Sequence, residues 1–269
     1  MPQDGIPARV VAHTASRGQT ASAEVSMPEM TSVEKAVKAA FERDRRINLH
    51  RYPIRFEFDI TKGALALEGE VENIIAKKRA FEIASEVEGI QGVMDRLTVA
   101  PGERRGDGAI RDSLVRELLE EPALLLCTIR VHNKGSMETV RESTDTSGNV
   151  INISVNEGII QLNGAVPSLS HKRLAGVLAW WTPGCRDVIN GMQVTPPETD
   201  NDDEIADALR LVLEKDPLIH ADRIGIRVKD RVVTLTGLAG NKEEKKMAEL
   251  DAWYLLGVNK VVNNIDIRR

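Results

Sequence analysis

The chain has 269 residues, of which 42% are hydrophobic, 29% are charged and only 3% are aromatic. This balance is typical of a soluble globular protein with mainly aliphatic cores, and the length would ordinarily give one or two domains. The net charge of −5 argues against a general affinity for nucleic acid, because phosphate binding needs a surplus of cations on one face.

The first thirty residues are rich in Ala, Ser, Thr, Gly and Pro without periodicity, so we expect residues 1–30 to form a flexible tail. They contain no long apolar run of the kind found in a secretory signal. No stretch of the chain approaches the ~18 apolar residues of a membrane span. We therefore expect a cytoplasmic protein, and a peripheral position at a membrane stays open.

A helix and a strand hairpin are predicted after this tail. Thr31 or Ser32 is expected to cap the helix, because Val33, Val37 and Phe41 recur on one helical face. Beyond the helix, four apolar residues alternate with polar ones, which is the pattern of a strand with one buried face. These four are Ile54, Phe56, Phe58 and Ile60.

The pattern that comes next occurs three times along the chain. Gly69, Gly164 and Gly237 each close a strand-like run, and a second glycine follows each of them after twenty residues. Between the two glycines lies a helix-like run with two alanines four residues apart, and an Asp or Asn follows six residues after the second glycine. The further positions are Gly89, Gly184 and Gly257; Ala80 and Ala84, Ala175 and Ala179, Ala248 and Ala252; and Asp95, Asn190 and Asn263. Agreement at so many fixed offsets indicates a three-copy repeat.

Each copy has the predicted order α-β-β-α-β. Its second and third strands are joined by a helix, so we expect them to be parallel. The fold class is therefore α+β, with three tandem domains that each contain a small three-stranded mixed sheet and two helices packed on one face. We place these domains at residues 31–100, 107–195 and 202–269, separated by polar linkers that contain proline.

The second copy carries about twenty extra residues, at about 123–148. Counting forward from Pro122 makes Ile129 the counterpart of Ile224 in the third copy, whereas counting back from Gly164 gives that place to Ile151. The second count is the better one, because its alternation continues unbroken through the hairpin. We expect the insertion to be a projecting hairpin or loop.

The third copy ends its second strand with V-x-L-x-G, from Val233 to Gly237, and its last strand with V-x-N-x-I, from Val261 to Ile265. These motifs and the order of elements resemble the BON domain, named after bacterial osmotic-shock and nodulation proteins. The resemblance extends in three copies from residue 33 to the C-terminus. It implies a small α/β fold without a known catalytic centre, and attachment to phospholipid surfaces or partner proteins, often under envelope or osmotic stress.

Paired cations stand twelve and eleven residues before each second glycine, namely Lys77 and Lys78, Lys172 and Arg173, and Lys245 and Lys246. At about 1 kcal/mol per cation close to an anionic membrane, six cations on one face would give useful adhesion. We therefore predict these six as phospholipid-binding residues. The alternative is that they only cover the solvent face of a helix, which the neighbouring Glu243 and Glu244 favour.

Trp180, Trp181 and Trp253 stand late in the second helix of their copies. Adjacent helical residues point about 100° apart, so Trp180 and Trp181 cannot both face one core. We expect packing within or between copies, including an oligomer contact. The alternatives are a membrane-interface anchor and a surface that binds a partner. A homo-oligomer is therefore one alternative.

The sequence contains none of the common catalytic or nucleotide-binding motifs. Its five histidines are scattered, and Cys127 and Cys185 form no CxxC pattern, so we expect no metal site. We predict a non-enzymatic protein without a cofactor that binds an anionic phospholipid surface or an envelope-associated protein. The alternative is a cytosolic interaction scaffold that uses the 123–148 insertion and exposed tryptophans.

Overall fold

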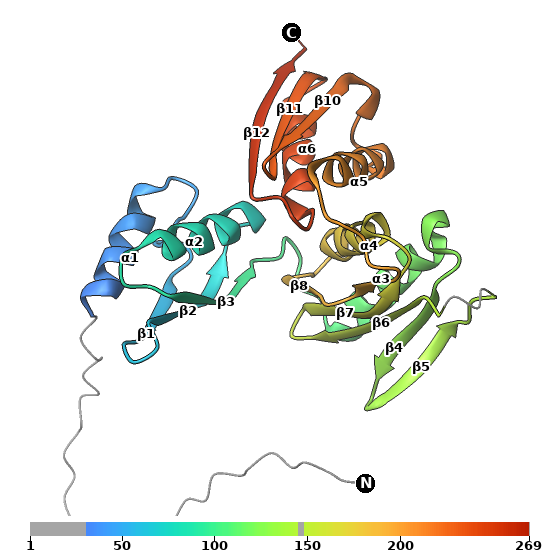
Figure 1. Cartoon of the computed structure of the whole chain (residues 1–269), viewed down its shortest axis with the longest axis horizontal. Helices are drawn as coiled ribbons and strands as arrows, with labels where there is room; N and C mark the ends of the chain where they lie inside the picture. The colour runs from blue at the N-terminus through green and yellow to red at the C-terminus, as the bar shows by residue number, and fades with distance from the viewer. Residues whose placement is uncertain (1–30, 145–147, 269) are drawn as a thin grey trace, which may run out of the picture. The chain divides into compact units, whose positions relative to one another are not determined.

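The structure is a computed structural model that describes residues 31–144 and 148–268 (Figure 1). The tail predicted for residues 1–30 lies outside the described residues. Within the described ranges the chain forms three domains of similar element order. The α+β fold class and the three tandem copies are confirmed.

The first domain has the predicted order of helices and strands. Its elements are α1 (Ser32–Arg43), β1 (Ile54–Asp59), β2 (Ala64–Val71), α2 (Ile74–Glu86) and β3 (Gly92–Val99). Thr31 caps α1, and the Glu34 side chain accepts a hydrogen bond from the Thr31 backbone in return, which completes a capping box. Strand β2 pairs antiparallel with β1 and parallel with β3, so the predicted parallel crossover is confirmed.

The third domain repeats this topology. Its elements are α5 (Asp202–Lys215), the 3-10 turn η2 (Ala221–Arg223), β10 (Ile224–Lys229), β11 (Val232–Ala239), α6 (Lys242–Tyr254) and β12 (Lys260–Ile267). Strand β11 lies between β10 and β12, antiparallel to the first and parallel to the second. Ile224 pairs with Gly237 just as Ile54 pairs with Gly69, so the two hairpins share one register.

The second domain carries extra strands at one edge of its sheet. Its elements are α3 (Asp107–Glu120), η1 (Pro122–Leu124), β4 (Thr128–Asn133), β5 (Ser136–Arg141), β6 (Val150–Asn156), β7 (Ile159–Val166), α4 (Leu169–Trp181), β8 (Asp187–Asn190) and β9 (Gln193–Val194). Ile151 pairs with Gly164, so the count that made Ile151 the counterpart of Ile224 is confirmed.

The insertion forms a hairpin, but this hairpin extends the sheet and does not project from the domain. Strand β4 pairs parallel with β6, and the outer strand β5 pairs antiparallel with β4. The physical reason is burial, because Ile129 and Val131 of β4 enter the core below the sheet. The second sheet is therefore larger than the three-stranded sheet that we expected.

The first glycine of each repeat allows a close backbone approach within the hairpin. A Cβ atom at Gly237 would lie 2.0 Å from the Arg223 carbonyl oxygen, and one at Gly164 would lie 2.1 Å from that of Val150. Both glycines also have positive φ angles, of 110° and 114°. The repeated glycine is thus explained by the geometry of the hairpin.

The buried apolar side chains form two clusters. One belongs to the first domain and includes Phe41, Leu65 and Leu97. The other runs through the second and third domains without a break and also takes in Ile74 of α2. The repeated alanines of α2, α4 and α6 are all buried, which lets each helix approach its sheet closely. The second and third domains therefore share one core.

Among residues 31–144 and 148–268, every helix is too short or too polar to cross a membrane.

Candidate functional site

The Asp or Asn of each third strand anchors the helix that precedes it. The amide of Asn263 donates to the carbonyl oxygen of Lys245 at 2.9 Å, and Asn190 donates in the same way to Lys172 at 2.8 Å. Their side-chain oxygens accept backbone N–H groups two residues further on. Asp95 accepts from the backbone of Leu97 likewise, but a carboxylate cannot donate, and it lies 3.2 Å from the Lys77 ammonium instead.

Lys77, the first cation of its pair, is 8% exposed. Its Nζ donates to the carbonyl oxygen of Leu97 and lies 3.1 Å from Asp187 of the second domain. Burial raises the pKa of Asp187, and the charge of Lys77 opposes that rise. In the third domain, Nζ of Lys245 donates to the carbonyl oxygen of Ile265 at 2.6 Å, which is the same bond at the equivalent place. These two lysines make bonds inside the protein.

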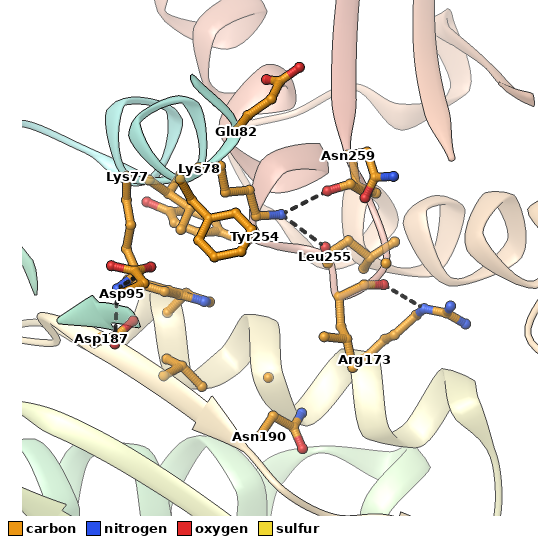
Figure 2. A pocket seen from close by; sticks show the side chains of 18 of the residues that line it. Lys77, Lys78, Glu82, Asp95, Arg173, Asp187, Asn190, Tyr254, Leu255 and Asn259 are labelled. Atoms are coloured by element: carbon orange, nitrogen blue, oxygen red, sulfur yellow. Dashed lines mark hydrogen bonds and ion pairs between the residues drawn. The ribbon is translucent and has the colours of Figure 1, made fainter. Parts of the chain in front are cut away.

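Lys78 extends from α2 to the loop that follows α6 (Figure 2). Its Nζ donates to the carbonyl oxygens of Val258 at 3.1 Å and Leu255 at 3.4 Å, and it lies 5.6 Å from the centre of the Trp253 ring. No carboxylate of the described residues lies within ion-pair distance of it. Burial lowers the pKa of Lys78 to about 8.

Arg173 of α4 joins the second domain to the third and to the linker between them. Its side chain is 1% exposed, and its Nε donates to the carbonyl oxygen of Leu256 at 2.9 Å. The guanidinium also pairs with Asp200 of the linker, which in turn lies 3.2 Å from Arg231. Its Nη1 has no hydrogen-bond partner among the described residues.

The six predicted phospholipid-binding residues do not share one solvent-facing surface. Lys77 and Arg173 are buried, Lys245 bonds to its own domain, and Lys78 spans the first and third domains. Of the six, Lys246 alone is exposed, and Lys172 is half-buried. The phospholipid role of these six residues stays a prediction.

The three tryptophans lie where the second and third domains meet. The Trp180 ring stacks on Tyr254 of α6 with 5.4 Å between ring centres, and Nε1 of Trp181 donates to Asp251 at 2.9 Å. Trp253 is 1% exposed. The partner role of Trp180 and Trp181 stays a prediction, whereas Trp253 is too buried to contact a partner in this structure.

Asp251 is a buried acid that our reading of the sequence missed. It is completely enclosed, and burial raises its pKa to about 8, with a further rise from the charge of Asp216 at the end of α5. The hydrogen bond from Trp181 acts in the opposite direction. Its spacing was a usable signal, because Asp251 follows Ala248 by three residues and so shares its buried helical face.

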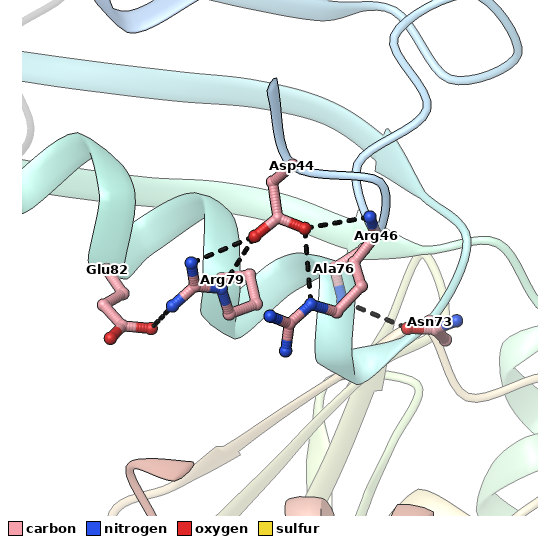
Figure 3. Close-up of polar contacts among 6 residues, drawn as sticks. All are labelled: Asp44, Arg46, Asn73, Ala76, Arg79 and Glu82. Carbon is pink, nitrogen blue, oxygen red and sulfur yellow. Dashed lines mark hydrogen bonds and ion pairs between the residues drawn. The ribbon is translucent and has the colours of Figure 1, made fainter. Parts of the chain in front are cut away.

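A second polar cluster joins α2 to the residue that follows α1 (Figure 3). Arg79 donates through two nitrogens to Asp44, each at 3.0 Å, and also pairs with Glu82. Burial works to raise the pKa of Asp44, but hydrogen bonds from Arg46 and Arg79 outweigh it and hold that pKa below its usual value. The cluster links α2 to the end of α1, and Glu82 is engaged in an ion pair within it.

A cavity of about 710 Å³ lies where α2, α4 and the loop after α6 meet, and we call it the junction cavity (Figure 2). All three domains contribute to its walls. Its lining residues are Ile74, Lys77, Lys78, Phe81, Glu82, Ser85, Glu86, Asp95, Arg173, Gly176, Trp180, Asp187, Val188, Asn190, Tyr254, Leu255, Leu256, Gly257, Val258 and Asn259. Its size is that of pockets that hold small molecules.

The described residues include no group of His, Cys, Asp and Glu side chains placed to hold a metal ion. Cys127 and Cys185 are both buried, and burial raises the pKa of the Cys185 thiol, which makes that sulfur a poor nucleophile.

Comparison with protein families gives one match, to the BON domain, and it covers residues 31–101, 137–196 and 201–269. These three segments contain the repeated hairpin, helix and last strand of every copy. In the second copy the match begins inside the insertion, at β5. No curated protein sequence matches the chain.

Solved structures that the chain matches include the C-terminal domain of CdsD, the structural protein of the type III secretion system of Chlamydia trachomatis. It is 16% identical over 90% of this chain and 100% of its own, with a TM-score of 0.23. The PrgH periplasmic domain is 10% identical over 80% of this chain and 95% of its own, with a TM-score of 0.22. Similarity at this level says nothing about the function of this chain.

Proposed function

Because the chain belongs to the BON domain family, we propose that it is a non-enzymatic protein that attaches to a phospholipid surface. The family is generally linked to phospholipid or membrane binding. The observation that carries the proposal for this chain is a group of exposed leucines, Leu125, Leu126 and Leu218, which we call the leucine patch.

All three side chains of the leucine patch are more than half exposed. Leu125 and Leu126 are each 57% exposed and Leu218 is 64% exposed. Glu121 and Lys215 form a 2.8 Å ion pair that joins the ends of α3 and α5. Leu125 and Leu126 follow Glu121 within five residues, and Leu218 follows Lys215 within three. The patch therefore belongs to one end of the core that the second and third domains share. Exposed apolar groups of this kind often mark contact surfaces.

Side chains of the insertion bond to the backbone segment that carries Leu125 and Leu126. Arg141 at the end of β5 donates to the carbonyl oxygens of Leu119, Leu124 and Cys127, and the Ser143 hydroxyl donates to that of Leu126. These bonds fix the backbone around Leu125 and Leu126, so little loop entropy would be lost when the leucines enter a lipid surface.

Burying three leucines that are about three-fifths exposed would contribute about 3–5 kcal/mol, because full burial of each contributes about 1.5–3 kcal/mol. Glu121 and Asp216 border the patch, so its attraction to lipid is apolar and not electrostatic. Attachment through the leucine patch should therefore be insensitive to salt, whereas attachment through the six cations should weaken as salt rises.

The test is co-sedimentation of the full chain with vesicles of phosphatidylcholine and phosphatidylglycerol, at low and at high sodium chloride. We expect the protein to sediment at both, and the variant Leu125→Ser, Leu126→Ser, Leu218→Ser to stay in solution. Ile60→Ser is the matched control, since Ile60 is an exposed apolar residue of the first domain outside the patch. Failure of the unaltered chain to sediment at low salt would reject the proposal.

The same experiment separates the two binding surfaces. Binding that disappears at high salt, and in the variant Lys172→Gln, Lys246→Gln, would favour the predicted cations over the leucine patch.

A second candidate function is protein binding through the insertion, which the exposure of β5 favours. Met137 and Val140 are both exposed on this outermost strand of the second sheet. Self-association through β5 would appear in analytical ultracentrifugation as a mass above that of one chain. It should revert to one chain in the variant Met137→Lys, Val140→Lys, and a single-chain mass for the unaltered protein would rule out such self-association.

A further inference from the structure

The junction cavity contains a cation without a counter-ion. Three cationic side chains line the cavity, and two of them are neutralised: Lys77 by Asp95 and Asp187, and Arg173 by Asp200. The third, Lys78, donates only to two backbone carbonyls. An ammonium group has three donors, so one remains for another acceptor.

The nearest acid along the same helix is engaged elsewhere. Glu82 stands four residues after Lys78, which is the usual spacing for an ion pair on a helix. It instead pairs with Arg79, which is itself held by Asp44 (Figure 3). The cationic end of Lys78 is therefore left in the cavity beside apolar walls.

The walls of the junction cavity include apolar side chains that are partly open to solvent. Phe81 of α2 and Leu256 after α6 both line the cavity and are both exposed. Trp180, whose ring stacks on Tyr254, and Ile74 also line the cavity. Covering these apolar side chains with a ligand is favourable because it removes apolar surface from water.

We propose that the junction cavity binds a monomeric amphiphile with a single carboxylate, whose head pairs with the Lys78 ammonium and whose apolar body lies along Phe81, Trp180 and Leu256. This site is separate from the leucine patch and does not rest on attachment to a membrane. A pocket of this size that combines apolar walls with one well-placed polar group is typical of small-molecule sites.

The charges of the lining exclude other ligand classes. Asp95 and Asp187 already pair with Lys77, and Glu82 pairs with Arg79. Glu86 adds a further negative charge to the lining, so a polyphosphate or another multiply charged anion would meet more repulsion than the single free ammonium could offset. A metal ion is disfavoured because Asp95 and Asp187 already share Lys77. One uncompensated ammonium matches one carboxylate.

The test is titration of the full chain with dodecanoate below its micelle-forming concentration, followed by Trp fluorescence and by calorimetry. We expect saturable binding of one dodecanoate per chain. Dodecanol, which has the same chain but no charge, should bind at least tenfold more weakly. Lys78→Met should weaken dodecanoate binding by at least tenfold.

Lys246 provides the matched control, because it occupies the position equivalent to Lys78 in the third domain and is exposed. Lys246→Met should leave dodecanoate binding unchanged. If Lys78→Met proves unfolded by circular dichroism, Phe81→Asp replaces it, since it puts a negative charge at an exposed wall position and should give the same loss. The proposal is overturned if dodecanoate does not saturate, if dodecanol binds equally well, or if the folded variant binds dodecanoate unchanged.

The result of the dodecanoate titration is independent of the vesicle experiment. The leucine patch variant should bind dodecanoate as the unaltered chain does, even where it no longer sediments with vesicles.

Discussion

Replacement of Arg173 by methionine tests whether a repeated cation stabilises the contact between domains. The substitution removes the hydrogen bond from Nε to the Leu256 carbonyl, and a bond to a charged donor contributes about 1.5–3 kcal/mol. It also removes the ion pair with Asp200. That acid is partly exposed and still has its ion pair with Arg231, so the loss of this pair costs only about 0–1 kcal/mol. Methionine fills part of the space and removes the unbonded Nη1. We therefore expect a loss of about 2–4 kcal/mol of unfolding free energy.

The assay is urea unfolding followed by Trp fluorescence, since all three tryptophans lie in the core region that the second and third domains share. With a slope of about 2 kcal/mol/M, the midpoint should fall by roughly 1–2 M. Lys172→Met is the control, because Lys172 is the half-buried neighbour of Arg173 and should change the stability by less than about 0.5 kcal/mol. A midpoint for Arg173→Met equal to that of the unaltered chain would refute this reasoning, as would an equal fall for both variants.

Two further predictions concern backbone geometry and pH. Gly237→Ala should destabilise the chain by at least about 2 kcal/mol, because the added Cβ would lie 2.0 Å from the Arg223 carbonyl oxygen and the backbone there has a positive φ. Gly102→Ala is the control, since Gly102 has open space around it, and it should leave the urea midpoint unchanged. The raised pKa of Asp251 means that folding takes up a proton between about pH 4 and pH 8, so its contribution to stability is lost as pH rises through that window. Asp251→Asn keeps an acceptor for Trp181 and should gain stability relative to the unaltered chain from pH 5 to pH 8; an equal difference between their urea midpoints at both pH values would contradict this.

The fold was largely predictable because its signals are local and repeated. The first helix of every copy ends at an acidic C-cap residue, namely Asp44, Glu121 and Asp216. The glycines and alanines recur because each has one steric role within a single domain. Such a role depends on neighbours in the same unit, so it appears at a fixed offset in every copy.

The insertion shows where a local pattern is not enough. The alternation of Ile129 and Val131 was visible in the sequence, but which strand β4 would pair with depends on an unpaired edge at β6. That edge becomes apparent only once the sheet is assembled. A strand with a buried face has a strong reason to join an existing sheet and not to project into solvent.

The candidate site was only half visible in the sequence. The repeated places of the paired cations were found, but their roles were not, because a long side chain bonds to whatever its own copy and the neighbouring copies present. Lys77 meets Asp187 of the second domain, and Lys78 meets carbonyls of the third. At the equivalent position in the third domain, Lys246 is exposed. Periodicity does not encode how one copy faces another.

Lysine acetylation, quantified by mass spectrometry on the folded chain, tests most directly whether the repeated cations serve internal contacts. Lys77 and Lys246 can be compared within one reaction. We predict that Lys246 is acetylated readily, while Lys77, enclosed with Asp95 and Asp187, reacts at least tenfold more slowly until the chain is unfolded. Equal rates at Lys77 and Lys246 in the folded chain would contradict the account.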